Sequence, residues 1–188
     1  MPFIRALNVR RALTDVGVLT PAQQAAIFAA VRPETIRAIQ AAQDMAWLDI
    51  TLSAELNNAI FAVMSQPEYR RWSRAMALHV IKRSMVSGMV EAALRLFDVT
   101  PQGLFKMMPR GWGATYKDAG VVTVAAVPPL STRFAFVDLP APMRTSQYLE
   151  TIAGGMETVF DMCHVDGKIV IERGSGVDMV ATWVAARI

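Results

Sequence analysis

The fold is decided by one stretch about two-thirds of the way along the chain, Gly120-Val-Val-Thr-Val-Ala-Ala-Val-Pro-Pro-Leu-Ser-Thr-Arg-Phe-Ala-Phe-Val-Asp138. Its first eight residues are rich in β-branched side chains, and the Pro-Pro-Leu-Ser that follows has the composition of a turn. From Thr132 onward the side chains alternate, with Phe134 and Phe136 on the same face. The stretch therefore predicts a β-hairpin with one buried face.

A second hairpin is predicted near the C-terminal end, after an amphipathic helix over residues 144–163. Lys168–Glu172 and Val177–Ala185 have strand composition and are joined by Gly174-Ser-Gly176. Two hairpins separated by one helix imply a four-stranded antiparallel sheet, with the helix across one face where its apolar stripe is buried. The pair Gly154-Gly155 within that helix predicts a close approach to another backbone.

The residues before the first hairpin are predicted to be mainly helical. Thr20-Pro21 and Thr100-Pro101 each combine an N-cap with a proline at the first helical position, and Ser65 with Glu68 has the spacing of a capping box. The stretch 109–113 is predicted to be a disruption of the helix or a tight corner, which places Trp112 on a loop. Helices are expected over residues 3–16, 22–31 and 34–46, from Ser53, from Tyr69 to about Gly88, and after Pro101, with an extended connector at 47–52.

These elements predict a single α+β domain over residues 1–188. An N-terminal helical part, residues 1–64, precedes a core of residues 65–188 that ends in ββαββ. Because 53% of the residues are hydrophobic and 19% are charged, the chain can bury a substantial core. We expect the helical part and the sheet to share it.

Composition also narrows the classes of function. The net charge of +3 comes from 19 basic and 16 acidic residues spread along the chain, which disfavours nucleic-acid binding. With the single cysteine Cys163, no disulfide can form within the chain. No apolar run reaches the length of a membrane span, and the first residues lack the apolar core of a signal peptide. We expect a cytoplasmic protein that is not transmembrane.

The chain shows no defensible catalytic or metal-binding motif. His79 follows Trp72 and Met76 along the predicted long helix and is either a haem ligand with apolar walls or, as we favour, an ordinary half-buried histidine. His164 is better explained as a cation at a helix C-terminus than as a metal ligand, because the adjacent Cys163 side chain diverges from it. We expect no bound metal and no catalytic residue.

Two further features have both a functional and an ordinary explanation. Arg70, Arg71 and Arg74 crowd one helix, and could meet an acidic partner or a phosphate-rich surface, but such runs are more often a solvated face. The twelve methionines, such as Met156, fit either a malleable pocket or an ordinary methionine-rich core.

A family resemblance rests on residues 94–120, which lead into the first hairpin, on Tyr148-Leu-Glu-Thr-Ile-Ala-Gly-Gly-Met-Glu157, and on a last strand that contains Trp183. Over residues 65–185 the chain resembles a myxobacterial family of uncharacterised cytoplasmic proteins. It is also similar to the ligand-binding domains of nitric-oxide signalling and Golgi transport, which include haem–nitric-oxide-binding and 4-vinyl-reductase domains. This resemblance implies a cavity between helices and sheet, frequent dimerisation, and a role in small-ligand sensing or protein docking.

The chain departs from the haem-binding members of that superfamily. Those members carry an axial histidine on a helix shortly before the first hairpin and a Tyr-x-Ser-x-Arg motif for the propionates. Residues 98–120 contain no histidine, His79 lies too early, and the motif is missing from the sequence. We therefore expect no cofactor, with haem as the alternative.

We predict a non-enzymatic regulatory or adaptor domain that binds itself as a homodimer, another protein, or a small apolar ligand. One alternative is a haem- or tetrapyrrole-binding sensor or a vinyl-reductase-like enzyme, and a second is a membrane-surface binder using the basic helix. Arg70, Arg71, Arg74 and an exposed Trp112 are the interaction candidates. The ligand-pocket candidates are Trp72, Met76, His79, Phe105, Trp112, Phe134 and Met156.

Overall fold

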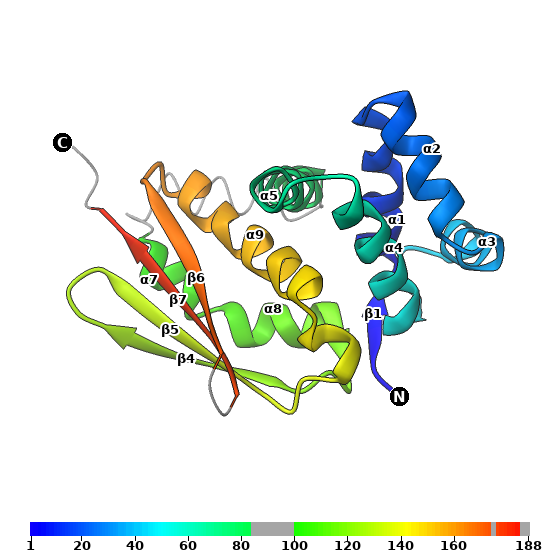
Figure 1. The fold of residues 1–188 in the computed structure, drawn as a ribbon. Helices are drawn as coiled ribbons and strands as arrows, with labels where there is room; N and C mark the ends of the chain where they lie inside the picture. Colours follow the sequence, from blue (N-terminus) through cyan, green and yellow to red (C-terminus); the bar gives the residue numbers. More distant parts are fainter. Residues whose placement is uncertain (84–99, 174–175, 185–188) are drawn as a thin grey trace.

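The computed structural model describes residues 1–83, 100–173 and 176–184 (Figure 1). The helices are α1 (Ala6–Asp15), α2 (Pro21–Ala30), α3 (Pro33–Ala41), α4 (Ile50–Ala62), α5 (Gln66–Arg83), α7 (Pro101–Phe105), α8 (Met108–Thr115) and α9 (Ser146–Met162), with short 3-10 turns at Val16–Val18 and Ala141–Arg144. The strands are β1 (Phe3–Arg5), β2 (Trp47–Asp49), β3 (Tyr116–Lys117), β4 (Val121–Val127), β5 (Ser131–Val137), β6 (Gly167–Arg173) and β7 (Val177–Trp183).

The two predicted hairpins are confirmed, and together they form an antiparallel sheet in the order β4-β5-β7-β6. The second hairpin joins the first through its later strand, because β5 pairs with β7 from Ser131 opposite Thr182 to Phe136 opposite Val177. Helix α9 packs on one face of the sheet, as its apolar stripe requires (Figure 1). The α+β class and the ββαββ order predicted from the sequence are therefore correct.

The predicted caps also form. The Thr20 side chain accepts a hydrogen bond from the Gln23 amide, and Gln23 reaches back to the Thr20 amide at 3.2 Å. The Glu68 carboxylate accepts the Ser65 amide at 2.8 Å, and Thr100 caps α7 through the Gly103 amide. These contacts explain why the chain starts helices where it does.

The predicted close approach at Gly154 is confirmed and brings α9 against α5. A Cβ added at Gly154 would lie 2.9 Å from both the Arg70 carbonyl oxygen and the Ser73 Cβ. The buried apolar residues form one cluster that draws on the helices of the first half and on the four-stranded sheet, with Ile27, Ile60, Phe134 and Phe160 fully buried.

A second sheet, of order β2-β1-β3, was not predicted. β1 pairs with β2 on one side and with β3 on the other, so that the N-terminus is tied to the segment just before the first hairpin. Arg5 stabilises this junction. Its guanidinium lies over the Trp47 ring and donates hydrogen bonds to the Met45 and Ala114 carbonyl oxygens. The predicted helix therefore starts at Ala6 and not at Phe3, since strand pairing outweighs helical periodicity there.

Several predicted boundaries need correction. The connector at 47–52 is strand β2 followed at once by α4, because the Asp49 side chain caps α4 through the Thr51 amide at 2.8 Å. The corner at 109–113 is instead helix α8, with a proline in its first turn. The predicted helix end near Gly88, the Gly174-Ser175 part of the turn and the strand end at Ala185 lie outside the described residues.

Within the described ranges, no helix combines the length and the apolar character needed to cross a membrane.

Candidate functional site

The inner face of the four-stranded sheet carries an aromatic cluster that unites two of the predicted pocket residues. Phe105 of α7 lies edge-on to Phe134 of β5, with ring centroids 5.0 Å apart, and contacts Phe160 of α9 and Trp183 of β7. Met156 of α9 is also buried. The predicted residues Phe105 and Phe134 therefore meet, and they serve as core between sheet and helices.

Trp112 lies elsewhere, and the prediction of an exposed, loop-borne indole is wrong. Its side chain sits on helix α8, is 5% exposed and packs on Tyr116 and Phe136. The indole N–H donates to the Gly120 carbonyl at 3.1 Å. The glycines on either side lie within the helix, and the burial of so large an aromatic surface holds α8 against the sheet.

The remaining pocket candidates belong to α5. Trp72 is buried against Tyr69, Met76 is half-buried, and His79 points outward with 62% of its side chain exposed. The His79 Nδ1 lies 3.7 Å from a carboxylate oxygen of Asp15, at the end of α1. Among the described residues, the ring that Trp72 stacks on is Tyr69, which is not one of the rings around Phe105.

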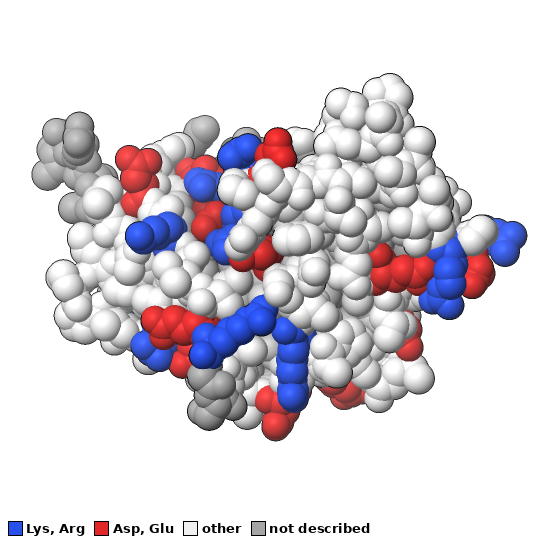
Figure 2. Space-filling view, in the orientation of Figure 1, with Lys and Arg blue, Asp and Glu red and all other residues white. Residues whose placement is uncertain are grey.

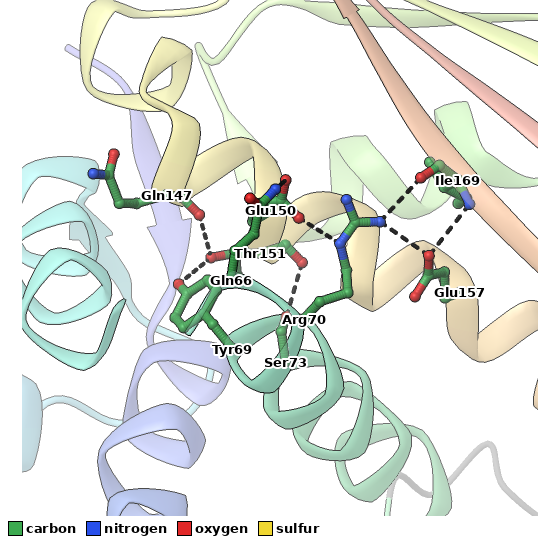
Figure 3. Close-up of polar contacts among 9 residues, drawn as sticks. All are labelled: Gln66, Tyr69, Arg70, Ser73, Gln147, Glu150, Thr151, Glu157 and Ile169. Carbon is green, nitrogen blue, oxygen red and sulfur yellow. Dashed lines mark hydrogen bonds and ion pairs between the residues drawn. The ribbon is translucent and has the colours of Figure 1, made fainter. Parts of the chain in front are cut away.

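Arg70 and Arg74 of α5 form a polar seam with α9, and Figure 3 shows the part of it around Arg70. Arg70 donates from Nε to Glu150 and from Nη1 to Glu157, the latter at 2.9 Å, and the three side chains are 17%, 7% and 10% exposed. Arg74 pairs with Asp161 through two contacts of 2.7 Å. Of the three arginines among the interaction candidates, Arg71 alone is exposed, so most of this basic run faces α9 and not solvent.

Neutral side chains complete the seam. Gln66 donates to Glu150 at 2.6 Å, Ser73 donates to the Thr151 carbonyl at 2.9 Å, and the Tyr69 hydroxyl meets the Thr151 hydroxyl. The seam also reaches the sheet, since Glu157 accepts the Ile169 amide and Arg70 donates to the Ile169 carbonyl (Figure 3). Charges placed this deep are tolerated because each has an opposite charge and further hydrogen bonds.

This seam is the polar feature that the sequence-based search missed. Its signal was present, because Gln66, Arg70 and Arg74 recur every four residues on one face of α5. On α9 the acids Glu150, Glu157 and Asp161 follow the same helical face. A search for opposite charges on matching faces of two buried helices would have found it, whereas a search for catalytic motifs could not.

A second buried polar group lies where the two halves of the chain meet. The Tyr148 hydroxyl lies 3.5 Å from the Ser53 hydroxyl of α4, and Asn57 donates to Ser53 at 3.4 Å. Burial raises the pKa of Tyr148 well above its ordinary value and raises the pKa of Tyr116 to about 12. Both phenols therefore stay protonated at neutral pH and act as hydrogen-bonding groups.

No protein-family model and no curated protein matches the chain. Solved structures do resemble it. An alanine-to-glycine mutant of the Fe(II) unliganded H-NOX protein from K. algicida aligns with a TM-score of 0.66 and 11% identity, over 97% of this chain and 98% of that one. The unmutated K. algicida protein gives 0.64 and 10% identity, over 97% of each chain. A mutant H-NOX of T. tengcongensis gives 0.53 and 8%, over 92% and 94%.

These likenesses establish that the chain has the fold of H-NOX domains, the haem–nitric-oxide-binding proteins to which the sequence pointed. At such identities they establish the fold alone. The expected relation to a myxobacterial family receives no support from them.

Solved H-NOX structures are haem proteins. Histidine and cysteine side chains are common ligands of haem iron. The sequence has two histidines, and both His79 and His164 are exposed, the latter just beyond the end of α9. Cys163 is half-buried, and burial raises the pKa of its thiol to about 11, which disfavours the thiolate that binds iron. Within the described residues, no three His, Cys, Asp or Glu side chains group as metal ligands. The residues present do not fit a haem held by an internal histidine or thiolate.

Proposed function

We propose that the chain is a non-enzymatic regulatory or adaptor domain that uses the H-NOX fold without a histidine-bound haem and acts through contacts with protein partners. The observation that carries this proposal is the position of the two histidines. The axial ligand of a haem must lie against the buried macrocycle, and His79 and His164 both lie at the surface.

The packing of the interior supports the same function. Gly154 brings α9 to the backbone of α5, and the charged groups of the seam are paired with one another, so they bind no further group in this arrangement. The Phe105 ring packs on Phe134 of the sheet and on Phe160 of α9. A small apolar ligand bound at this point between sheet and α9 would have to displace these rings, whereas a protein partner can use the surface directly.

The face of the molecule shown in Figure 2 also favours specific protein contacts over binding to an anionic membrane. Basic and acidic side chains are interspersed on this face, with no broad area of a single charge. Membrane-surface binding through basic residues requires several of them turned outward together. Arg70 and Arg74 are instead engaged by α9, which weakens the basic-helix alternative.

A haem-binding sensor is the second candidate, favoured by one observation. The H-NOX likeness runs over 97% of the chain, so it includes the N-terminal helices as well as the sheet. The two candidates differ in a property that can be measured directly, which is whether the folded protein takes up haem in a defined ratio.

Titration of the purified chain with haemin, followed by absorbance, separates them. We expect no saturable Soret band that survives desalting. A stable band at one haem per chain would contradict the proposed function and favour the sensor. The variants His79→Ala and His164→Ala serve as matched controls, because loss of such a band in one of them would identify the iron ligand.

A further inference from the structure

The two edge strands of the four-stranded sheet, β6 and β4, differ in whether other groups bond to their outward-facing backbone atoms. At the β6 edge, the Ile169 amide donates to Glu157 at 3.2 Å and the Ile169 carbonyl accepts from Arg70 at 3.1 Å. One carboxylate and one guanidinium thus make the bonds that a neighbouring strand would make (Figure 3). The buried ion pair of the seam therefore blocks this edge against another strand.

The β4 edge has no such cover within the described part of the chain. There β4 pairs with β5 on one side, and no strand pairs with its other side (Figure 1). Its seven residues, Val-Val-Thr-Val-Ala-Ala-Val, include no charge, whereas β6 carries Lys168, Glu172 and Arg173. Val121 and Val127 are 58% and 40% exposed at its two ends. An uncharged strand of this length with an open edge is a template for pairing.

We propose that this β4 edge binds the β4 edge of a second copy of the chain. A two-fold axis through Val124 makes the strands antiparallel, so Val124 faces its own copy and Thr123 faces Ala125 of the other chain. Each exposed Val121 then lies opposite a Val127, and two sheets of four strands become one of eight. No like charges meet along the whole strand, which is the electrostatic condition for self-pairing.

The same features favour a second copy over a strand of another protein. Pairing about Val124 sets only uncharged side chains against one another, with Val121 opposite Val127, so the same surface patch serves both copies, as a two-fold interface requires. Such an interface closes on itself and yields a dimer without further growth. The surface area that one pair of strands buries is small compared with the ~1,200 Å² or more buried in stable complexes. The dimer is therefore expected to be weak, and its population should depend on protein concentration.

This inference rests on the proposed function in one respect, because it names one of the protein partners. Its failure is distinguishable, since the haemin titration reports on the cofactor whether or not the chain dimerises. A monomeric chain that binds no haem would leave the adaptor function standing and remove the β4 interface.

Cysteine crosslinking of the full chain tests the register. Both variants are made in a Cys163→Ala background, which removes the native thiol. Val124→Cys places one cysteine beside its own copy, at a Cα separation of about 4.5–5.5 Å that a disulfide can span. Val170→Cys is the matched control at the centre of the blocked β6 edge. We expect oxidation to yield a covalent dimer from Val124→Cys and none from Val170→Cys.

Sedimentation velocity of the native chain over a range of concentrations tests the interface without new cysteines. Thr123→Glu/Ala125→Glu sets like charges opposite each other across the axis, and we expect at least tenfold weaker dimerisation with an unchanged circular dichroism spectrum. Thr182→Glu adds a charge to the central strand β7 and should sediment like the native chain. A native chain that stays monomeric, a dimer insensitive to the double change, or crosslinking through position 170 instead of 124 would overturn the proposal.

Discussion

The hydrogen atom that serves as the side chain of Gly154 sets the distance between α5 and α9. A methyl group there would lie 2.9 Å from the Arg70 carbonyl oxygen, a backbone atom that cannot move without shifting the helix. We predict that Gly154→Ala lowers the free energy of unfolding by about 1–3 kcal/mol through overpacking.

Gly155→Ala is its control, because the nearest atom there is the Ala77 Cβ at 3.8 Å, an ordinary contact. That variant should be neutral or up to about 1 kcal/mol more stable, since alanine favours the helix. Urea denaturation of both proteins checks this pair. Equal destabilisation by the two changes would mean that α9 does not approach α5 as closely as the structure has it.

The carboxyl group of Glu55, again a single residue, leads to a prediction of how the stability of the fold depends on pH. Hydrogen bonds from Arg32 are the largest cause that lowers the Glu55 pKa from its ordinary 4.5 to about 2, with Thr35 adding a further bond. A carboxyl whose pKa is depressed by folding stabilises the fold above its unfolded pKa, and this contribution is lost as the pH falls from about 4.5 to about 2.

Glu55→Gln should therefore cost stability at neutral pH, and its melting temperature should approach that of the native chain towards pH 2. Thermal melts at several pH values test this. A difference between the two proteins that stays constant with pH would show that the Glu55 charge contributes nothing.

At the scale of elements, the seam between α5 and α9 depends on one cation facing two buried acids. Arg70→Met would leave Glu150 and Glu157 without their partner and open the Ile169 backbone at the β6 edge. We predict a loss of about 3 kcal/mol or more in the free energy of unfolding.

Arg74→Met provides the comparison, because Arg74 and Asp161 are each about a third exposed, and such pairs contribute about 1 kcal/mol or less. Chemical denaturation would measure both variants. A similar small effect from the two changes would contradict the structural role assigned to Arg70.

The elements themselves were predicted unevenly, for physical reasons. Caps and hairpins are local, so Thr20, Ser65 and Thr100 predicted helix starts that the structure confirms. Strands β1 and β3 have three and two residues, too short for periodicity, and they exist only because segments far apart in the sequence pair. Pro109 and the glycines after it suggested a corner, but the burial of Trp112 holds α8 as a helix.

At the scale of the whole molecule, the order of helices and hairpins was enough to predict an α+β sheet with one covered face and to point to the H-NOX fold. The candidate site was harder, because hydrophobic periodicity marks which residues turn inward but not which of them meet. Phe105 and Phe134 meet in the core, Trp112 and Trp72 join the same core but contact other aromatic rings, and His79 turns outward.

The central claim is that this H-NOX fold works through its surface and holds no haem on an internal ligand. Native mass spectrometry of the chain purified from cells supplied with haem tests it most directly, because one spectrum reports both bound groups and oligomeric state. The account predicts masses of the bare polypeptide and, at higher concentration, of its dimer. A dominant species carrying one haem per chain would contradict it.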